Sequence, residues 1–226
     1  MKHLKLMMGA SLLALGLQAQ ASDFNGHILG LRAGGSFQLA AHEATTTGPG
    51  ITVKDKVGVA GPQGLLGVDY TWKTGMWSPD LDWGVVASAD WMLGDAKTKV
   101  NSAGTSSYYS VKQDNRFSLG AKFGVCTSDK VYPFVKVGAV AGEWSTAVRT
   151  QNGAIKTTDW MYGATVGMGV DFSVHAGGSI GFVTELDWYA SKTHNLRLAS
   201  GAASYSKVEV KPYTANVAVT YKYKIA

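Results

Sequence analysis

The chain has 226 residues, a formal net charge of +5 and 16% charged residues, against about a quarter in a typical soluble domain. A positive charge this small, with no basic stripe, argues against nucleic-acid binding. The single cysteine, Cys126, excludes an intramolecular disulfide. Glycine is abundant at 28 residues and proline scarce at 5. No run of 18 or more apolar residues follows the N-terminal segment, so we expect no membrane-spanning helix.

The first 21 residues have the pattern of a cleaved signal peptide. Lys2 and Lys5 precede an apolar run over residues 6–17, and the small residues Ala19 and Ala21 precede Ser22. We expect cleavage before Ser22. The remaining residues 22–226 form one domain of 205 residues, whose net charge without the two lysines falls from +5 to +3.

Eight later segments alternate between apolar and polar residues with the period of two that a β-strand requires. They span residues 27–39, 57–73, 81–97, 109–125, 132–146, 156–174, 180–192 and 213–225. In the last segment Tyr213, Val217 and Tyr221 share an apolar face opposite Lys222 and Lys224. Pro62 interrupts the second segment and predicts a bulge or another irregularity there.

The connections between these segments alternate between long and short. The long ones include breaker or Ser/Gly-rich stretches at residues 45–50, 101–107 and 199–206, and the short ones are turns at 127–130 and 175–178. An even strand number with alternating loop lengths is typical of outer-membrane barrels. The sequence therefore predicts an all-β fold, an eight-stranded antiparallel up-and-down transmembrane β-barrel.

Aromatic residues near the ends of the apolar faces favour a membrane barrel over a soluble one. Trp83 and Trp91 are eight steps apart, roughly 26 Å along a strand at about 3.3 Å per residue. A strand tilt of about 40° reduces this to roughly 20 Å, close to the spacing of two aromatic girdles. The predicted girdle contains Trp72, Trp83, Trp91, Trp160, Phe172, Trp188, Tyr213, Tyr221 and Tyr223.

Three stretches together with the N-terminal segment resemble the small outer-membrane β-barrel proteins of the OmpA/OmpX and opacity-protein type. These are the strand over residues 132–142, the strand over 185–189 and the terminal Tyr221-x-Tyr223 pattern. The resemblance covers essentially all of residues 22–226. It implies the outer membrane of a Gram-negative cell envelope, with lipid, lipopolysaccharide and the barrel assembly machinery as partners. The chain ends in Ile225-Ala226 rather than on the aromatic residue usual in this family.

The opposite faces of the strands place charged residues of both signs in the lumen. Buried charges must be paired, so we expect a salt-bridge network. Its predicted members are Arg32, Asp69, Asp90, Arg116, Lys122, Lys136, Asp171, Glu185, Asp187, Lys222 and Lys224. The preferred interpretation is a structural plug that blocks flow, and the alternative is a narrow porin-like channel.

An enzyme is the less favoured hypothesis. Glu185 and Asp187 form a same-face carboxylate pair that could serve acid–base chemistry, but we favour the interpretation that the two acids pair with nearby lumenal cations. Some barrels of this type are lipid A-modifying hydrolases with a His–Ser–carboxylate set. His194 lies near Ser191 and Glu185, without the His-x-Ser-Asn arrangement that such enzymes have. We expect no catalytic residues, no cofactor and no metal site, and we regard Cys126 as a bystander.

The external loops are the remaining candidates for a functional role. Tyr108, Tyr109 and Tyr205 lie among Ser and Gly, a composition that supports adaptable contacts. We therefore expect a monomeric surface protein, a surface antigen with a structural, adhesion or host-contact role and a possible extracellular partner.

Overall fold

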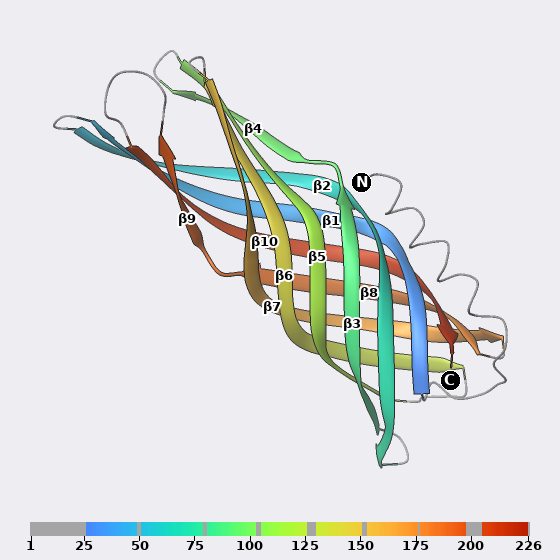
Figure 1. Ribbon diagram of the computed structural model, residues 1–226. Helices are drawn as coiled ribbons and strands as arrows, with labels where there is room; N and C mark the ends of the chain where they lie inside the picture. Colours follow the sequence, from blue (N-terminus) through green and yellow to red (C-terminus); the bar gives the residue numbers. More distant parts are fainter. Residues whose placement is uncertain are drawn as a thin grey trace.

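The computed structural model describes residues 26–48, 51–78, 81–102, 105–125, 130–150, 153–175, 177–197 and 205–225. The predicted signal peptide and its cleavage residues Ala19, Ala21 and Ser22, like Cys126, lie outside these ranges. The described part is all β-structure (Figure 1). Its strands are β1 (Gly26–Gly48), β2 (Ile51–Ser78), β3 (Leu81–Leu93), β4 (Ala96–Ser102), β5 (Thr105–Val125), β6 (Val131–Thr150), β7 (Gly153–His175), β8 (Gly178–Tyr189), β9 (Lys192–Arg197) and β10 (Tyr205–Lys224).

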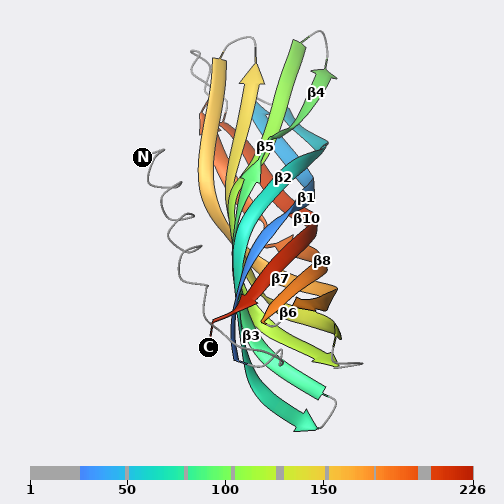
Figure 2. The same ribbon diagram turned by 90° about the vertical axis from the view of Figure 1, so that its right-hand side faces the viewer.

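Eight of these strands form a closed antiparallel barrel, which confirms the predicted fold class. Neighbouring strands follow the order β1-β2-β3-β5-β6-β7-β8-β10, and β10 returns to β1. The closing ladder runs without a register shift from Ile28 opposite Lys224 to Thr47 opposite Tyr205. Where all eight strands are paired, closure leaves no open sheet edge, because each of them has two neighbours. Figure 2 shows the strands of the barrel from the side.

The two remaining strands, β4 and β9, arise where a predicted strand breaks. The segment expected to run over 81–97 ends at Leu93, and Gly94 adopts a φ of 107°, which only glycine accepts readily. After Asp95 the chain resumes as β4, which pairs with β5. In the same way β8 ends at Tyr189, and β9 pairs with β10.

Several strands are longer than predicted. Thr45 to Gly48 belong to β1 and Ile51 onward to β2, so the expected breaker stretch at 45–50 is mostly a paired hairpin. Likewise β4 reaches Ser102 and β5 begins at Thr105, inside the expected loop at 101–107. Threonine is β-branched and suits a paired strand well. The turn between His175 and Gly178 lies where it was predicted, with Gly177 at a φ of 77°.

The irregularity predicted at Pro62 is wrong. The β1–β2 ladder passes Phe37 and Pro62 without a register shift. Pairing between β2 and β3 begins only at Gly64, so the missing N–H of Pro62 interrupts no ladder on that side. The shifts in β2 lie instead between Lys73 and Gly75 and between Met76 and Ser78.

Gly26 and Lys224 lie at one end of the barrel, here called the terminal end, and the opposite end is called the distal end (Figure 1). Toward the distal end the wall divides, because β2–β3 pairing stops at Gly64 and Leu93, and β8–β10 pairing stops at Trp188 and Tyr213. Two four-stranded sheets continue from there, in the orders β9-β10-β1-β2 and β4-β5-β6-β7. Among the described residues, no helix is long and apolar enough to cross a membrane.

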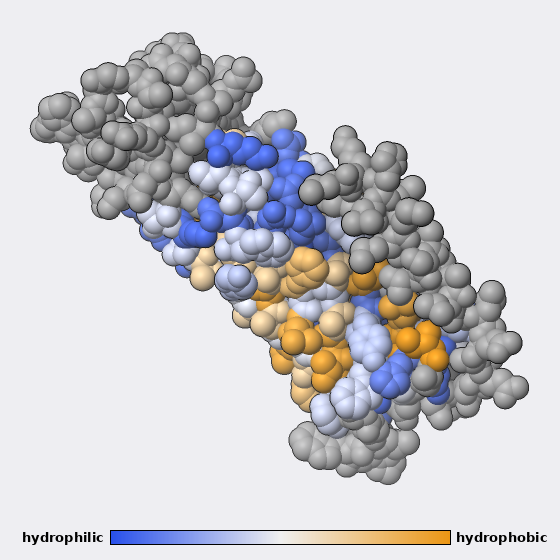
Figure 3. Space-filling view, viewed as in Figure 1, coloured by the Kyte–Doolittle hydropathy of each residue, from blue (hydrophilic) through white to orange (hydrophobic). Residues whose placement is uncertain are grey.

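Side chains alternate between lumen and exterior as the sequence predicts. In β8, for example, buried and exposed residues alternate through Glu185 and Asp187 to Tyr189. Leucine, valine and aromatic side chains are exposed on the outer face, whereas most of the buried side chains inside the barrel are polar or charged. Figure 3 shows hydrophobic residues gathered over the half of the barrel nearer the terminal end, with hydrophilic residues beyond them. This arrangement is the reverse of a soluble globular domain.

Candidate functional site

The middle of the lumen contains a cluster of six buried charges, three cations and three carboxylates, here called the central cluster. Its members are Arg32, Asp90, Arg116, Lys136, Glu185 and Asp187, each at most 4% exposed. Five barrel strands supply them, so the cluster connects opposite walls. Equal numbers of the two signs leave the cluster with no formal net charge.

Arg116 is the centre of this cluster. Its Nη1 donates to Asp90 at 2.7 Å, while Nε and Nη2 donate to the two oxygens of Asp187 at 2.8 and 2.9 Å. The same guanidinium approaches Glu185 at 3.1 Å. Arginine suits this position because its planar fork can engage several carboxylates while remaining charged.

Glu185 is the second junction. It accepts from Arg32 of β1 at 2.7 Å and from Lys136 of β6 at 2.5 Å. Arg32 also lies 3.3 Å from Asp90. Each carboxylate of the cluster therefore faces at least one cation, as a charge in a dry interior requires.

Neutral polar groups supply further hydrogen bonds. Thr214 and Asn216 of β10 donate to Asp187 at 2.7 and 2.8 Å. Lys136 donates to Ser118, which is bonded to Ser88 at 2.6 Å. These hydrogen bonds restrict the orientations of the charged side chains of the cluster.

A second set of charges lies toward the terminal end, here called the terminal cluster. Lys122 and Lys222 each donate to Asp171 at 2.7 Å, and Lys73 lies 3.7 Å from Asp82. Asp69 is also buried in this region. The cluster again holds three lysines and three aspartates.

Aromatic rings complete the terminal cluster. The amino group of Lys73 lies 3.2 Å from the ring centroid of Tyr132, and that of Lys122 lies 3.6 Å from the centroid of Phe134. Both distances suit cation–π attraction. Tyr132 and Phe134 are themselves buried and lie with ring centroids 6.2 Å apart.

The structure therefore brings ten of the eleven predicted lumen charges into buried positions. The exception is Lys224, which is only half-buried at the terminal end. Lys73 and Asp82 were not predicted as members. Each lies two residues from an inward-facing position, Lys73 from Thr71 and Asp82 from Gly84. Extending the alternation to the strand ends would therefore have identified both.

On the distal side of the central cluster the lumen becomes less charged. Trp144 and Tyr189 pack edge to face with ring centroids 5.2 Å apart, and Gln113 donates to the Tyr189 hydroxyl at 2.7 Å. Apolar side chains on the same side of the central cluster are also buried, all at most 3% exposed, namely Ala40, Val59, Val111, Met161 and Val210. With Trp144 they make up an apolar layer on the distal side of the cluster, in which the glutamines Gln38, Gln63 and Gln113 are also buried.

All nine predicted girdle residues lie on the outer face. Trp72, Trp91, Trp160, Phe172, Trp188 and Tyr221 are exposed, whereas Trp83, Tyr213 and Tyr223 are half-buried. Trp188 and Tyr213 are directly paired across β8 and β10 toward the distal end. His175 donates to, or accepts from, the Tyr221 hydroxyl at 3.0 Å toward the terminal end.

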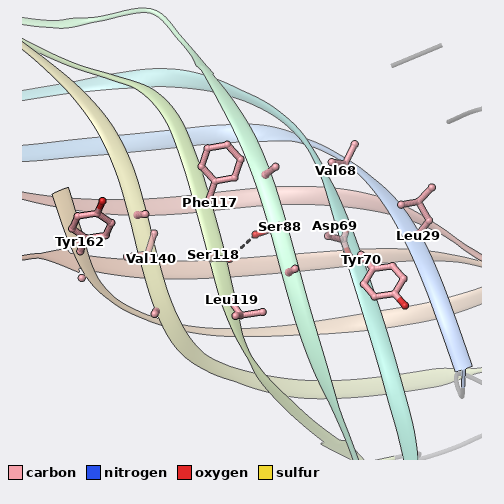
Figure 4. A pocket seen from close by; sticks show the side chains of 15 residues that line it. Leu29, Val68, Asp69, Tyr70, Ser88, Phe117, Ser118, Leu119, Val140 and Tyr162 are labelled. Carbon is pink, nitrogen blue, oxygen red and sulfur yellow. Dashed lines mark hydrogen bonds between the residues drawn. The ribbon is translucent and has the colours of Figure 1, made fainter. Parts of the chain in front are cut away.

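A hollow of about 570 Å³ lies over β2, β3, β5 and β6 (Figure 4). Alanines, including Ala89 and Ala139, line it, and the larger Phe117, Leu119 and Tyr162 stand around it. Its lining is mostly apolar and forms part of the hydrophobic outer face of the barrel. Ser88 and Ser118 also line it; both are buried and are hydrogen-bonded to each other at 2.6 Å.

The described residues do not assemble a catalytic set around the Glu185–Asp187 pair. Both carboxylates are bonded to Arg116, Arg32 or Lys136, and no histidine contacts them within the described part of the chain. The side chain of His194 lies outside the described set. Among the described residues, no group of three or more His, Cys, Asp or Glu side chains could hold a metal ion.

Comparisons with solved structures support the barrel. The fold is similar to that of the outer membrane protein OprG from Pseudomonas aeruginosa, with a TM-score of 0.57 and 13% identity over 88% of this chain and 97% of that one. It is also similar to the outer membrane protease OmpT from Escherichia coli, with a TM-score of 0.52 and 8% identity over 91% and 99%. The sequence matches no family model and no curated protein. The chain thus has the fold of the small outer-membrane β-barrels.

Proposed function

We propose that this protein is a non-enzymatic surface barrel of the bacterial outer membrane with a closed lumen. In this proposal the strands beyond Trp188 and Tyr213, here called the distal girdle, face the outside and carry a structural, adhesion or host-contact role. The termini and short turns face the periplasm. The N-terminal segment directs export, the assembly machinery inserts the chain, and the barrel acts as a monomer.

The observation that carries the proposal is the central cluster. Six charges connected by Arg116 and Glu185 occupy the middle of the lumen, and the apolar layer around Trp144 lies beyond them. Moving a hydrated ion through this region would require breaking ion pairs in a dry environment. This costs roughly several kcal/mol for each charge that is left without its partner. A structural plug is therefore favoured over a porin-like channel.

The same contacts argue against a lipid A-modifying hydrolase. A general base must be free to take a proton from a nucleophile. Glu185 accepts from Arg32 and Lys136, and Asp187 accepts from Arg116, Thr214 and Asn216. Both carboxylates are therefore engaged as structural acceptors.

Solute uptake tests the closed lumen. Purified protein would be reconstituted into liposomes, and swelling in small neutral sugars would be compared with that of empty liposomes and of liposomes containing a general porin. We expect swelling no faster than that of empty liposomes. Porin-like swelling would overturn the proposal and favour the channel.

Sidedness has a separate test. In a Cys126→Ser background, Thr45→Cys near the distal end and Lys130→Cys at the terminal end would be exposed in intact cells to a membrane-impermeant maleimide. We expect labelling of the first variant only, and labelling of the second only would reverse the orientation.

A hydrolysis assay on lipid A covers the enzyme alternative, for which no product is expected.

A further inference from the structure

Several polar atoms just beyond the central cluster have no hydrogen-bond partner. The side chains of Gln38, Gln63, Gln113 and Trp144 are buried, each at most 5% exposed. Among the described residues, nothing bonds to either polar atom of the Gln38 amide, to Oε1 of Gln63 or Gln113, or to Nε1 of Trp144. Nearly all buried polar groups in proteins are hydrogen-bonded, so five such atoms close together indicate a group that binds there.

These side chains belong to one cross-section of the lumen, here called the glutamine layer (Gln38, Gln63, Gln113, Trp144 and Tyr189). The Gln63 amide of β2 donates to the backbone oxygen of Gln113 on β5 at 3.3 Å, and the Gln113 amide donates to the Tyr189 hydroxyl on β8 at 2.7 Å. Trp144 of β6 lies directly opposite Gln113. Gln38 is two residues along β1 from the position opposite Gln63. Five strands therefore contribute to the layer.

Two N–H groups of the glutamine layer converge above Gly142. A methyl group added at Gly142 would lie 2.7 Å both from Nε2 of Gln113 and from Nε1 of Trp144. An indole nitrogen only donates, and a glutamine NH₂ has two hydrogens, of which Gln113 uses one for Tyr189. A single carbonyl oxygen could therefore accept from both residues.

The chemistry of the layer selects an uncharged amide. The central cluster beneath it compensates its own charges, so an added charge would be left without a partner in a dry interior. Both ends of the Gln38 amide are free, and a primary amide or ureido group can pair with it reciprocally, donating to Oε1 and accepting from Nε2. A carboxylate only accepts and an ammonium only donates, so neither can form this pair.

The apolar layer favours a molecule with an apolar part over water alone. Val59, Val111 and Val210, which are at most 1% exposed, lie on the same side of the central cluster as the glutamines. A buried water needs two to four polar partners, and these valines supply none. Small-molecule sites usually combine an apolar lining with a few polar groups, and an eight-stranded barrel is wide enough to hold one small ligand.

The division of the wall gives access to the glutamine layer from the distal end. Beyond this level the described parts of the two sheets share no backbone ladder. On one side the Gln63 amide donates to the backbone oxygen of Gly94 at 2.7 Å, and on the other Lys192 and Asp159 form a partly exposed ion pair. Side-chain contacts of this kind can open and close again while the barrel below stays paired.

We propose that the glutamine layer binds the amide or ureido group of a small uncharged molecule that enters from the distal end. Gln38 pairs with the amide reciprocally, Trp144 and Gln113 donate to its carbonyl oxygen, and Gln63 accepts its second N–H. The apolar part of the molecule packs in the apolar layer. Because the central cluster closes the lumen behind it, the molecule is held without passing through the barrel.

Nuclear magnetic resonance of the tryptophan indoles tests the proposal. The full barrel, with ¹⁵N-labelled indoles in neutral detergent, would be titrated with butyramide, N,N-dimethylbutyramide and butyrate. The Trp144 signal would be assigned with Trp144→Phe, and the signal of the exposed Trp91 reports general effects of the additive on the detergent. The test variant is Gln38→Leu. The matched control is Thr220→Val, which removes a buried hydroxyl without a printed partner from the terminal cluster instead.

We expect a saturable shift of the Trp144 indole signal with butyramide and none of the Trp91 signal. The dimethyl compound lacks N–H donors and butyrate carries a charge, so each should bind about tenfold or more weakly. Gln38→Leu should weaken butyramide binding to the same extent, and Thr220→Val should not change it. Heat-modifiable migration would confirm that both variants are folded, and the comparison of the three compounds on the parent protein needs no variant.

Three results would overturn the proposal. The absence of a saturable Trp144 shift would mean that the glutamine layer holds water only. Equal affinity for the dimethyl compound would mean that apolar contact alone accounts for binding. Unchanged butyramide binding in folded Gln38→Leu would place the amide elsewhere.

These outcomes are separable from those of the proposed function. The inference needs the fold and the glutamine layer, and it does not depend on sidedness or on a role of the external strands. Swelling or conductance together with selective amide binding would refute the closed lumen alone. A closed lumen with no amide binding would refute the glutamine layer as a site alone.

Discussion

Arg116 and Asp187 form a two-pronged ion pair across the lumen, with Nε and Nη2 of the arginine 2.8 and 2.9 Å from the two carboxylate oxygens. They belong to β5 and β8, which are separated in the barrel by β6 and β7. The pair therefore joins walls that have no backbone hydrogen bonds with one another. Because both side chains are fully buried, the barrel interior depends on their mutual compensation.

Replacing Arg116 by Ala should be strongly destabilising. Asp90 and Asp187 would each lose their hydrogen-bonded cation in a dry interior, and we expect a loss of about 3–5 kcal/mol in the free energy of unfolding. Urea titration of the folded barrel in lipid vesicles, followed by tryptophan fluorescence, measures this. The double variant Arg116→Met, Asp187→Leu should lose less than the sum of the two single variants. Additive losses would mean that the two side chains are not coupled.

Asp171 provides a comparison between buried and exposed ion pairs. Asp171→Asn removes the carboxylate to which both Lys122 and Lys222 donate, so we expect a loss of about 3–5 kcal/mol. The control is Asp159→Asn, which breaks the pair with Lys192, where the side chains are 30% and 41% exposed. That loss should stay within about 1 kcal/mol. Equal losses in the same urea titration would contradict a dry terminal cluster.

The faces of the strands were predictable from the sequence, but the partners of the charges were not. A period of two assigns Arg116 and Asp187 to the lumen without further information. Which carboxylate meets which cation depends on the stagger of strands around the barrel, which alternation does not encode. The strand ends were predicted wrongly for a different reason. Threonine-rich stretches such as 45–48 resemble loops in composition, yet they extend the hairpin because both sides can pair. Gly94, with its positive φ, ends β3, and this glycine could not be told apart in the sequence from the other glycines, 28 in all. β8 ends at Tyr189 without such a glycine.

A charge on the lipid-facing surface separates a membrane barrel from a soluble one. Leu119 is 59% exposed and lies in β5 between the two ends that carry aromatic residues. On one side Asn115 pairs with Glu143, which pairs with Trp160, and on the other side Phe123 pairs with Trp83. Leu119→Arg should cost about 2–4 kcal/mol in a bilayer. Ala41→Arg, on the same face beyond the distal girdle, should cost about 0–1 kcal/mol. A neutral effect of Leu119→Arg would mean that this surface faces water.

Close strand packing gives a glycine-specific prediction. A methyl group added at Gly163 would overlap the backbone oxygen of Trp188 on the neighbouring β8, whereas one added at Gly58 meets nothing within 4 Å. Gly163→Ala should therefore destabilise the barrel by about 1–3 kcal/mol through overpacking. Gly58→Ala should be neutral or slightly stabilising, because alanine restricts the unfolded chain. Folding yields and urea midpoints of the two variants provide the measurement, and equal values would place Gly163 in open space.

Ion current through single barrels tests the central claim most directly, because it reports whether the paired lumen is closed. Purified wild-type protein would be inserted into planar lipid bilayers, with insertion verified by recovery of the folded, heat-modifiable form from the membrane. The account predicts no sustained conductance at moderate voltage, since an ion would have to separate the pairs of the central cluster and cross the apolar layer around Trp144. Stable, long-lived open channels from the folded wild-type barrel would contradict it.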